Sequence, residues 1–145
     1  MFFIAHRGLF EGPDKEKENH PDQIEKALLS GFHSEVDIWH KDGKWFLGHD
    51  VPQYEVPLSF IANPMIWAHC KNIEAMMRLP NQNCFWHDKD SYTLTYSGFI
   101  WSYPGKALLS KKQIAVMPEM FAPAGIMPYG TYGGVCSDYV AQMRM

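Results

Sequence analysis

The chain has 145 residues and a formal net charge of −3, and 46% of its residues are hydrophobic. This length fits one domain, residues 1–145, with enough apolar side chains for a packed core. The acidic balance argues against a nucleic-acid partner, because phosphate backbones bind concentrated basic charge. No run reaches the roughly 20 apolar residues of a membrane span. The apolar start is too short for a secretory signal, so we expect a cytoplasmic protein.

The first part of the chain predicts alternating strands and helices, as a parallel sheet requires. Pro21 and Gly31 mark the start and the end of a helix. Asp42-Gly43 is a strong signal for a two-residue hairpin turn. In chain order, the predicted elements are a strand over Phe2–Ala5, a polar loop over 11–19, a helix over 21–31, and strands over 32–39 and Lys44–Leu47.

The second part predicts further strands but few helices. The segment 121–134 is rich in proline and glycine and has almost no helical pattern. The predicted elements are a strand over 65–70, a helix over 72–79 stopped by Pro80, and strands over 84–86, 99–103, 113–117 and 134–136. Cys70, Cys84 and Cys136 have no paired spacing, so we expect buried thiols, without a disulfide framework or a zinc knuckle.

Glu35 and Asp37 lie two residues apart on a predicted strand, so both side chains point to one face. Two neighbouring carboxylates repel each other unless a cation lies between them. Their oxygen atoms suit Mg²⁺ or Ca²⁺. An exposed acidic pair is the alternative, and a Glu-x-Asp pattern alone is a weak signal.

Two histidines fall at predicted strand ends, where functional groups often lie. His6 is followed by Arg7, which can bind a phosphate, and by Gly8, which permits a tight turn. His49 precedes Asp50, and either histidine could transfer a proton near neutral pH. We expect structural roles for the other histidines outside the site, which are His20, His33, His40 and His87.

These patterns together resemble the glycerophosphodiester phosphodiesterase family, over residues 1–50. The motifs that carry the resemblance are His6-Arg7-Gly8, Glu18-Asn19, Ala27, Gly31, Glu35-Val36-Asp37, Asp42-Gly43 and His49-Asp50. A weaker likeness to the last strand of the family lies in Gly134-Val135-Cys136-Ser137-Asp138.

The resemblance implies an α/β fold, a TIM-type (β/α)8 barrel with its site at the carboxyl ends of the strands. It also implies metal-dependent hydrolysis of a small glycerophosphodiester, with a divalent ion, Mg²⁺ or Ca²⁺ or alternatively Mn²⁺. The implied catalytic pair is His6 and His49, and Glu35 and Asp37 are implied metal ligands. Arg7 and Lys71 would bind phosphate, with Glu18 and Asn19 in support.

The chain departs from the family at the third metal ligand, where His69 occupies the position of a glutamate two residues before Lys71. Imidazole is a poorer ligand than carboxylate for Mg²⁺ or Ca²⁺. Three alternatives follow: His69 binds a softer ion such as Mn²⁺ or Zn²⁺, Asp88 or Glu119 takes its place, or the site binds metal weakly. A core histidine bonded to the backbone is the structural alternative.

Length is the second departure, because such barrels ordinarily need ~250 residues. We expect a reduced barrel that lacks several outer helices in its second half. Its bare faces are expected to be covered by a second copy, in a homo-oligomer, or by another protein. Two other functions stay open. One is a lyase-like relative that releases a cyclic phosphate, and the other is a non-catalytic descendant that binds a phosphorylated ligand or a partner protein.

Overall fold

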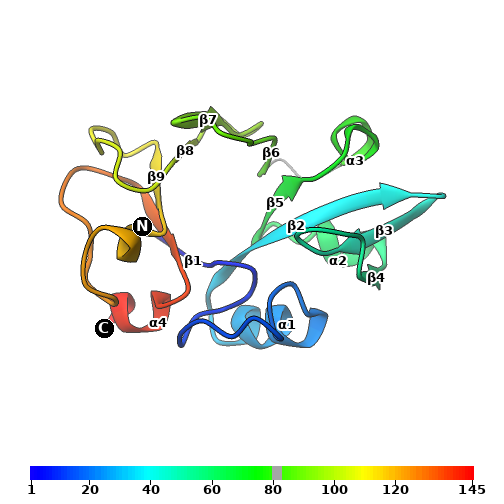
Figure 1. The fold of residues 1–145 in the computed structure, drawn as a ribbon, viewed down its shortest axis with the longest axis horizontal. Coiled ribbons are helices and arrows are strands. Elements are labelled where there is room, and N and C mark those ends of the chain that lie inside the picture. Colours follow the sequence, from blue (N-terminus) through cyan, green and yellow to red (C-terminus); the bar gives the residue numbers. More distant parts are fainter. Residues whose placement is uncertain (80–82) are drawn as a thin grey trace.

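The structure, a computed structural model, describes residues 1–79 and 83–145. Figure 1 shows a single curved sheet with short helices around it. The strands are β1 (Phe2–Ala5), β2 (His33–Lys41), β3 (Lys44–Leu47), β4 (Tyr54–Val56), β5 (Ile66–Cys70), β6 (Cys84–Phe85), β7 (Tyr92–Leu94), β8 (Ile100–Ser102), β9 (Gln113–Val116) and β10 (Gly134–Ser137). The helices are α1 (Pro21–Leu29), α2 (Leu58–Ile61), α3 (Ile73–Arg78), α4 (Val140–Arg144) and a 3-10 turn η1 (Pro118–Met120).

The sheet is mixed and has ten strands in the described residues. Its parallel part runs β6-β5-β2-β1-β10-β9-β8. Antiparallel hairpins extend this part, with β3 and β4 beyond β2 and β7 beyond β8. The carboxyl ends of the parallel strands therefore lie along one edge, where polar residues can gather.

The expectation of a reduced TIM-type (β/α)8 barrel is wrong. Three strand pairings are antiparallel, β2 with β3, β3 with β4 and β7 with β8, and in the described residues four short helices do not alternate with the strands. The segments 103–112 and 117–133 connect β8, β9 and β10 without an α-helix, because prolines and glycines interrupt both. Crossover helices are what a (β/α)8 barrel needs between each pair of its strands.

Local sequence signals explain the elements that were predicted near the N-terminus. Pro21 occupies the first turn of α1, and the ring of His20 accepts a hydrogen bond from the Asp22 amide. The β2–β3 hairpin turns at Asp42 and Gly43, which have φ values of 52° and 76°. Such positive values at both turn residues suit the right-handed twist of the strands.

Short elements whose stability depends on distant partners were missed by the sequence analysis. These are β4, α2, β7, η1 and α4, which have three to five residues each. Pro80, which was predicted to stop the helix after β5, lies outside the described residues, and α3 ends at Arg78.

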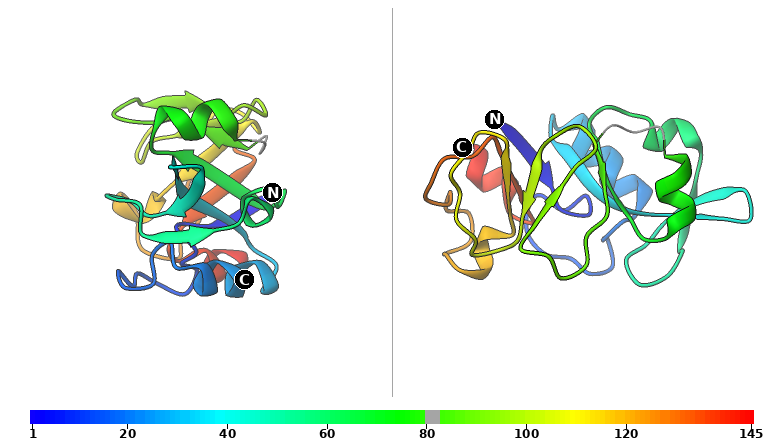
Figure 2. Two further views of the ribbon diagram at one scale, coloured as in Figure 1. Left: turned by 90° about the vertical axis from the view of Figure 1, so that its right-hand side faces the viewer. Right: turned by 90° about the horizontal axis from the view of Figure 1, so that it is seen from above.

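The core has an aromatic interior and two outer layers. The interior cluster lies on the concave face of the sheet and contains Trp67, Phe85 and Trp101 together with Ile4, Ile114 and Cys136. Helices α1 and α4 lie side by side on the outer face, as Figure 2 shows, and the guanidinium of Arg144 in α4 donates to the carbonyl of Ser30 after α1. All three cysteines are buried and free, as predicted.

The sheet curves far enough for the chain after β7 to meet β6. The amide of Tyr96 donates to the carbonyl of Cys84, and the hydroxyl of Thr93 donates to the carbonyl of Trp86. The aromatic cluster is thereby enclosed on several sides. No helix in the described ranges has the length and apolar character that crossing a membrane requires.

Candidate active site

A cavity of about 510 Å³ opens at the carboxyl edge of the parallel strands. Seven of the residues selected from sequence line this one cavity, and these are His6, Arg7, Glu35, Asp37, His49, His69 and Lys71. The remaining lining residues are His87, Asp88, Trp101, Tyr103, Pro104, Val116, Met117 and Met120. Residues up to 114 positions apart in the sequence thus share one polar pocket.

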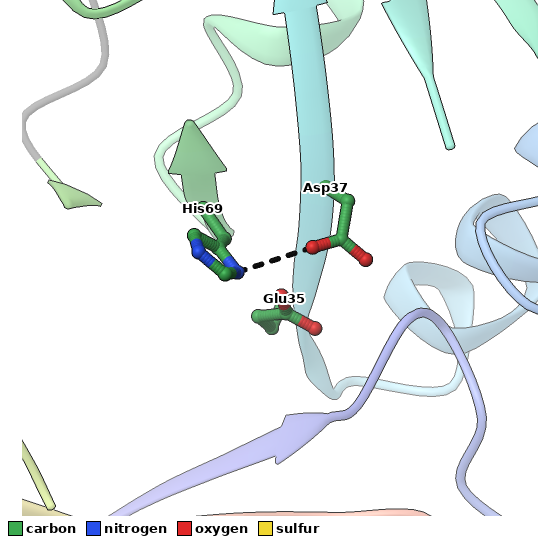
Figure 3. Close-up of side chains that lie close together, drawn as sticks. All are labelled: Glu35, Asp37 and His69. Carbon is green, nitrogen blue, oxygen red and sulfur yellow. Dashed lines mark ion pairs between the residues drawn. The ribbon is translucent and has the colours of Figure 1, made fainter. Parts of the chain in front are cut away.

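Glu35, Asp37 and His69 form a compact group of metal-ligand atoms, shown in Figure 3. One ligand atom from each residue lies within 4.8 Å of the others. The pairing of β2 with β5 explains this, because Asp37 is in register with His69. Alternation along β2 then brings Glu35 to the same face. Among the described residues, Asp88 and Glu119 are not part of this group.

Asp37 is 1% exposed and is held by hydrogen bonds on both of its carboxylate oxygens. Oδ2 accepts from the side-chain amide of Asn19 at 2.9 Å and lies 3.3 Å from the Nε atom of Arg7. Oδ1 lies 3.1 Å from the Nδ1 atom of His69. Burial raises the pKa of Asp37, but its bond to His69 and the charges of His69 and Arg7 outweigh this and lower the pKa to about 2.

Glu35 is buried as well, but fewer groups offset the negative charge of its carboxylate. Its Oε2 atom accepts the backbone amide of Arg7 at 3.1 Å. Burial and the nearby charge of Asp37 raise the pKa of Glu35 above its usual range. A cation placed between the two carboxylates would remove this repulsion, since an opposite charge favours the ionised form.

The ring of His69 is oriented by contacts on both nitrogens. Nε2 donates to the carbonyl oxygen of His87 at 2.9 Å, and the ring stacks on Phe85 with a centroid distance of 5.1 Å. Because a carbonyl can only accept, the proton of a neutral ring lies on Nε2, which leaves the Nδ1 lone pair facing Asp37. Metal-binding histidines are commonly held in this way. The residues present therefore fit a divalent cation.

His69 is also bonded to the backbone, as the structural alternative proposed. Burial lowers the pKa of His69, whereas the hydrogen bond to Asp37 and the charges of Asp37 and Glu35 raise it to a value above normal. Without a cation, a proton on Nδ1 thus occupies the position between the imidazole and Asp37. The two roles predicted for His69 therefore use different nitrogens of one ring: Nε2 bonds to the backbone, and Nδ1 would bind the metal.

The loop before α1 supports the carboxylates. Arg7 and Asn19 both have positive φ values, 52° and 58°, and the amide of Asn19 donates to the carbonyl of Arg7. The Nη1 atom of Arg7 donates to Glu18 at 2.9 Å. The side chain of Asn19 both donates to Asp37 and accepts the amide of Asp37. Glu18 and Asn19 therefore orient the arginine and the aspartate.

His6 has a buried carboxylate partner that the sequence analysis did not identify. Its Nδ1 atom lies 2.8 Å from Oδ1 of Asp138, which follows β10. Burial lowers the pKa of His6, but the hydrogen bond to Asp138 and the charge of Glu35 raise it to a value above normal. The backbone of Asp138 is in turn held by Glu119, whose Oε1 atom accepts the amide of Asp138. The Ser137-Asp138 pair at a strand end was the available signal.

His49 lies on the loop after β3, and its side chain is 43% exposed. Its Nδ1 atom is 2.7 Å from Oδ1 of Asp50. The amide of Gly48 donates to the carbonyl of Asp37, which fixes the start of this loop next to the carboxylate group. A Cβ atom on Gly48 would lie 2.0 Å from the carbonyl oxygen of Val51, so only glycine fits there.

Two further polar residues line the cavity, His87 and Asp88, of which the sequence analysis considered Asp88 only as an alternative third metal ligand. His87 was assigned a structural role, yet its ring faces the cavity, 5.6 Å from the ring of Tyr103. Asp88, next to His87, also lines the cavity. The other histidines with expected structural roles lie outside it: His20 caps α1, His33 accepts from Trp67, and His40 packs on Trp45.

Comparisons of the chain with protein-family models, with curated proteins and with solved structures find no match. The roles of the site residues therefore stay predictions that depend on the chemistry of the cavity.

Proposed function

We propose that this protein is a metal-dependent phosphodiesterase that hydrolyses a small glycerophosphodiester-like substrate. One observation carries the proposal: two histidines, a cationic arginine and a group of carboxylate and imidazole ligands line the same cavity. Each part of phosphodiester hydrolysis has a matching group there. The resemblance of residues 1–50 to the glycerophosphodiester phosphodiesterase family supports the same reaction.

Glu35, Asp37 and His69 would hold the divalent ion. Two carboxylates suit Mg²⁺ or Ca²⁺, while the imidazole moves the preference toward Mn²⁺. When bound, such an ion neutralises the charge that develops on the phosphoryl oxygens.

Arg7 and Lys71 are the cationic groups that would orient the phosphate. Arg7 is held rigidly, because Glu18 and Asp37 both contact its guanidinium group. Lys71 follows β5, and its amide donates to the carbonyl of Ile38 on β2. A guanidinium group binds phosphate through paired donors, and an ammonium group acts as a point charge.

His6 and His49 would move the protons. His49, the more exposed ring, takes the proton from a substrate hydroxyl adjacent to the phosphate as that oxygen bonds to phosphorus. His6, with its raised pKa, gives a proton to the alcohol oxygen as its bond to phosphorus breaks. Water then opens the cyclic phosphate, with the two proton transfers reversed, and the product is a phosphomonoester.

Glycerophosphocholine turnover, followed by phosphorus NMR with Mg²⁺ or Mn²⁺ present, tests the proposal. We expect His6→Ala and His49→Ala to lower kcat by roughly 10²- to 10⁴-fold, the usual effect of losing a general acid or base. His40→Ala, outside the cavity, is the matched control. A chelator should abolish turnover in the unaltered protein, and activity that survives both variants and the chelator would refute the proposal.

The same spectra separate the alternatives. A cyclic phosphate that accumulates without a phosphomonoester indicates a lyase-like enzyme. If no substrate is turned over, calorimetric titration with Mn²⁺ tests the non-catalytic alternative, because a scaffold that has lost its metal site should give no saturable heat.

A further inference from the structure

A short turn after β9 connects the wall of the polar cavity to the end of β10. It contains Met117 and the 3-10 turn η1, and both Met117 and Met120 line the cavity. Glu119 lies between them in the sequence but is not among the described residues that line the cavity. Its carboxylate is instead bonded to the residues at the end of β10.

The carboxylate of Glu119 binds two donors through a single oxygen atom. Oε1 accepts the hydroxyl of Ser137 at 2.9 Å and the backbone amide of Asp138 at 3.2 Å. The hydroxyl oxygen of Ser137 in turn accepts the amide of Tyr139 at 2.9 Å. Glu119 therefore holds two consecutive residues at the end of β10, and the side chain of the second, Asp138, contacts His6.

Two features of the turn are unfavourable for stability by themselves. Met117 has a φ of 45°, in the left-handed region that long side chains rarely adopt. The second carboxylate oxygen of Glu119, Oε2, is buried and has no hydrogen-bond partner among the described residues. Strained backbone clusters at functional sites, and an unpaired buried polar atom in a native protein calls for an explanation. Both features therefore indicate a role for this turn beyond packing.

The ring of His6 is oriented by Asp138. Its Nδ1 atom lies 2.8 Å from Oδ1 of Asp138, and His6 lines the cavity. A carboxylate accepts hydrogen bonds, and such a bond determines which ring nitrogen carries the proton. The proton of a neutral His6 ring therefore lies on Nδ1, which leaves Nε2 available to a substrate.

We propose that Glu119 is a positioning residue, which holds Asp138 against Nδ1 of His6 and so presents Nε2 of His6 to the substrate. This inference rests on the proposed function, in which His6 gives a proton to the leaving alcohol. Glu119 would not touch the substrate, since it does not line the cavity. Its role requires an acceptor oxygen at the right distance and not a negative charge, because both of its contacts are to neutral donors.

Two conservative variants separate the reach of this side chain from its charge. Glu119→Gln keeps the length and an acceptor oxygen, so it should behave like the unaltered protein. Glu119→Asp keeps the charge but is one methylene shorter, so its oxygen cannot reach both donors unless the turn moves. Glu25→Asp, at an exposed position on α1, is the matched control. Should Glu119→Asp not fold, Ser137→Ala, which removes one donor of the same contact, takes its place.

Nitrogen NMR of the His6 ring locates the proton without turnover. Above the pKa of His6, the unaltered protein, Glu119→Gln and Glu25→Asp should carry the proton on Nδ1, whereas Glu119→Asp should show a mixture of both tautomers. The charges of Glu35 and Arg7 also act on His6, and they are the same in all of these proteins.

Steady-state kinetics on glycerophosphocholine provides the second measurement. Glu119→Asp should lower kcat by roughly tenfold or more and change KM much less, because a misplaced catalytic group slows the chemical step. Glu119→Gln should retain most of the activity.

Equal losses in Glu119→Gln and Glu119→Asp would overturn the inference, because the charge of Glu119 and not its reach would then matter. An unchanged tautomer and an unchanged kcat in Glu119→Asp would overturn it as well. A changed tautomer in Glu119→Asp, in a protein that turns over no phosphodiester, would uphold the positioning of His6 while the proposed function fails.

Discussion

The histidines of this chain differ in the groups that face their ring nitrogens. His6 has a buried carboxylate on Nδ1, whereas the partner of His49, Asp50, is exposed to solvent. His69 has a backbone carbonyl on one side and Asp37 on the other. By these partners, His6 is the ring that retains a proton, His49 is the ring open to solvent, and His69 is the ring able to bind a metal.

Replacing Asp138 by Asn should lower the pKa of His6 toward its usual value, which proton NMR can follow. Because Asp138 raises the pKa of His6, the pair stabilises the fold fully below about pH 6.5 and loses this effect as pH rises through the raised value. The variant should therefore cost about 1.5–3 kcal/mol of unfolding free energy at pH 6 and less at pH 9. Urea unfolding at both pH values measures this.

Asp90→Asn is the control for this prediction, since Asp90 is exposed. If Asp138→Asn lowers the unfolding free energy equally at both pH values, then Asp138 acts through packing and not through the charge of His6.

At the scale of elements, one strand and its two neighbours determine the metal-ligand group. β2 carries Glu35 and Asp37 on one face, and its parallel partner β5 brings His69 beside Asp37. The antiparallel partner β3 leads into the loop of His49, which is tied to the Asp37 carbonyl through Gly48. A change in this loop should therefore lower the rate of catalysis more than it lowers the stability of the core.

Gly48→Ala should lower kcat by at least roughly tenfold, the range expected when a catalytic group is misplaced. The added methyl group would lie 2.0 Å from the Val51 carbonyl, so the loop with His49 must move. Steady-state kinetics on glycerophosphocholine, with the urea midpoint as a second measurement, checks this. Gly98→Ala is matched, because Gly98 also has a positive φ but an added Cβ atom there meets nothing within 4 Å.

At the scale of the whole molecule, the curved sheet leaves apolar side chains uncovered near its β6–β7 end. Met77, Trp86, Leu94 and Tyr96 are between 45% and 79% exposed there. Side chains of α3, β6 and β7 form this surface together. Burial of such side chains favours association of copies.

We expect sedimentation velocity at micromolar concentrations to show a homo-oligomer. Leu94→Lys should shift it toward the monomer, because a buried, unpaired charge is costly at an interface. Leu29→Lys, on α1, should leave the assembly unchanged. A stable monomer in the unaltered protein would contradict this prediction.

Local sequence signals were sufficient where neighbouring residues decide the structure. The first strand, α1, and the β2–β3 turn follow from short patterns, and so does the shared face of Glu35 and Asp37. The barrel expectation failed because it came from a resemblance of the first 50 residues, whereas the connections around β8, β9 and β10 depend on segments without helical pattern.

Only the tertiary structure joined distant residues. His6 and Asp138 are 132 positions apart, and they meet because β1 pairs with β10 with Ala5 opposite Ser137. Asp37 meets His69 through the register of β2 and β5. The sequence by itself determined the turns, the strand alternation and the residue types available for chemistry. Which of these residues become neighbours was decided by strand order and register, since these depend on packing across the whole sheet and not on local pattern.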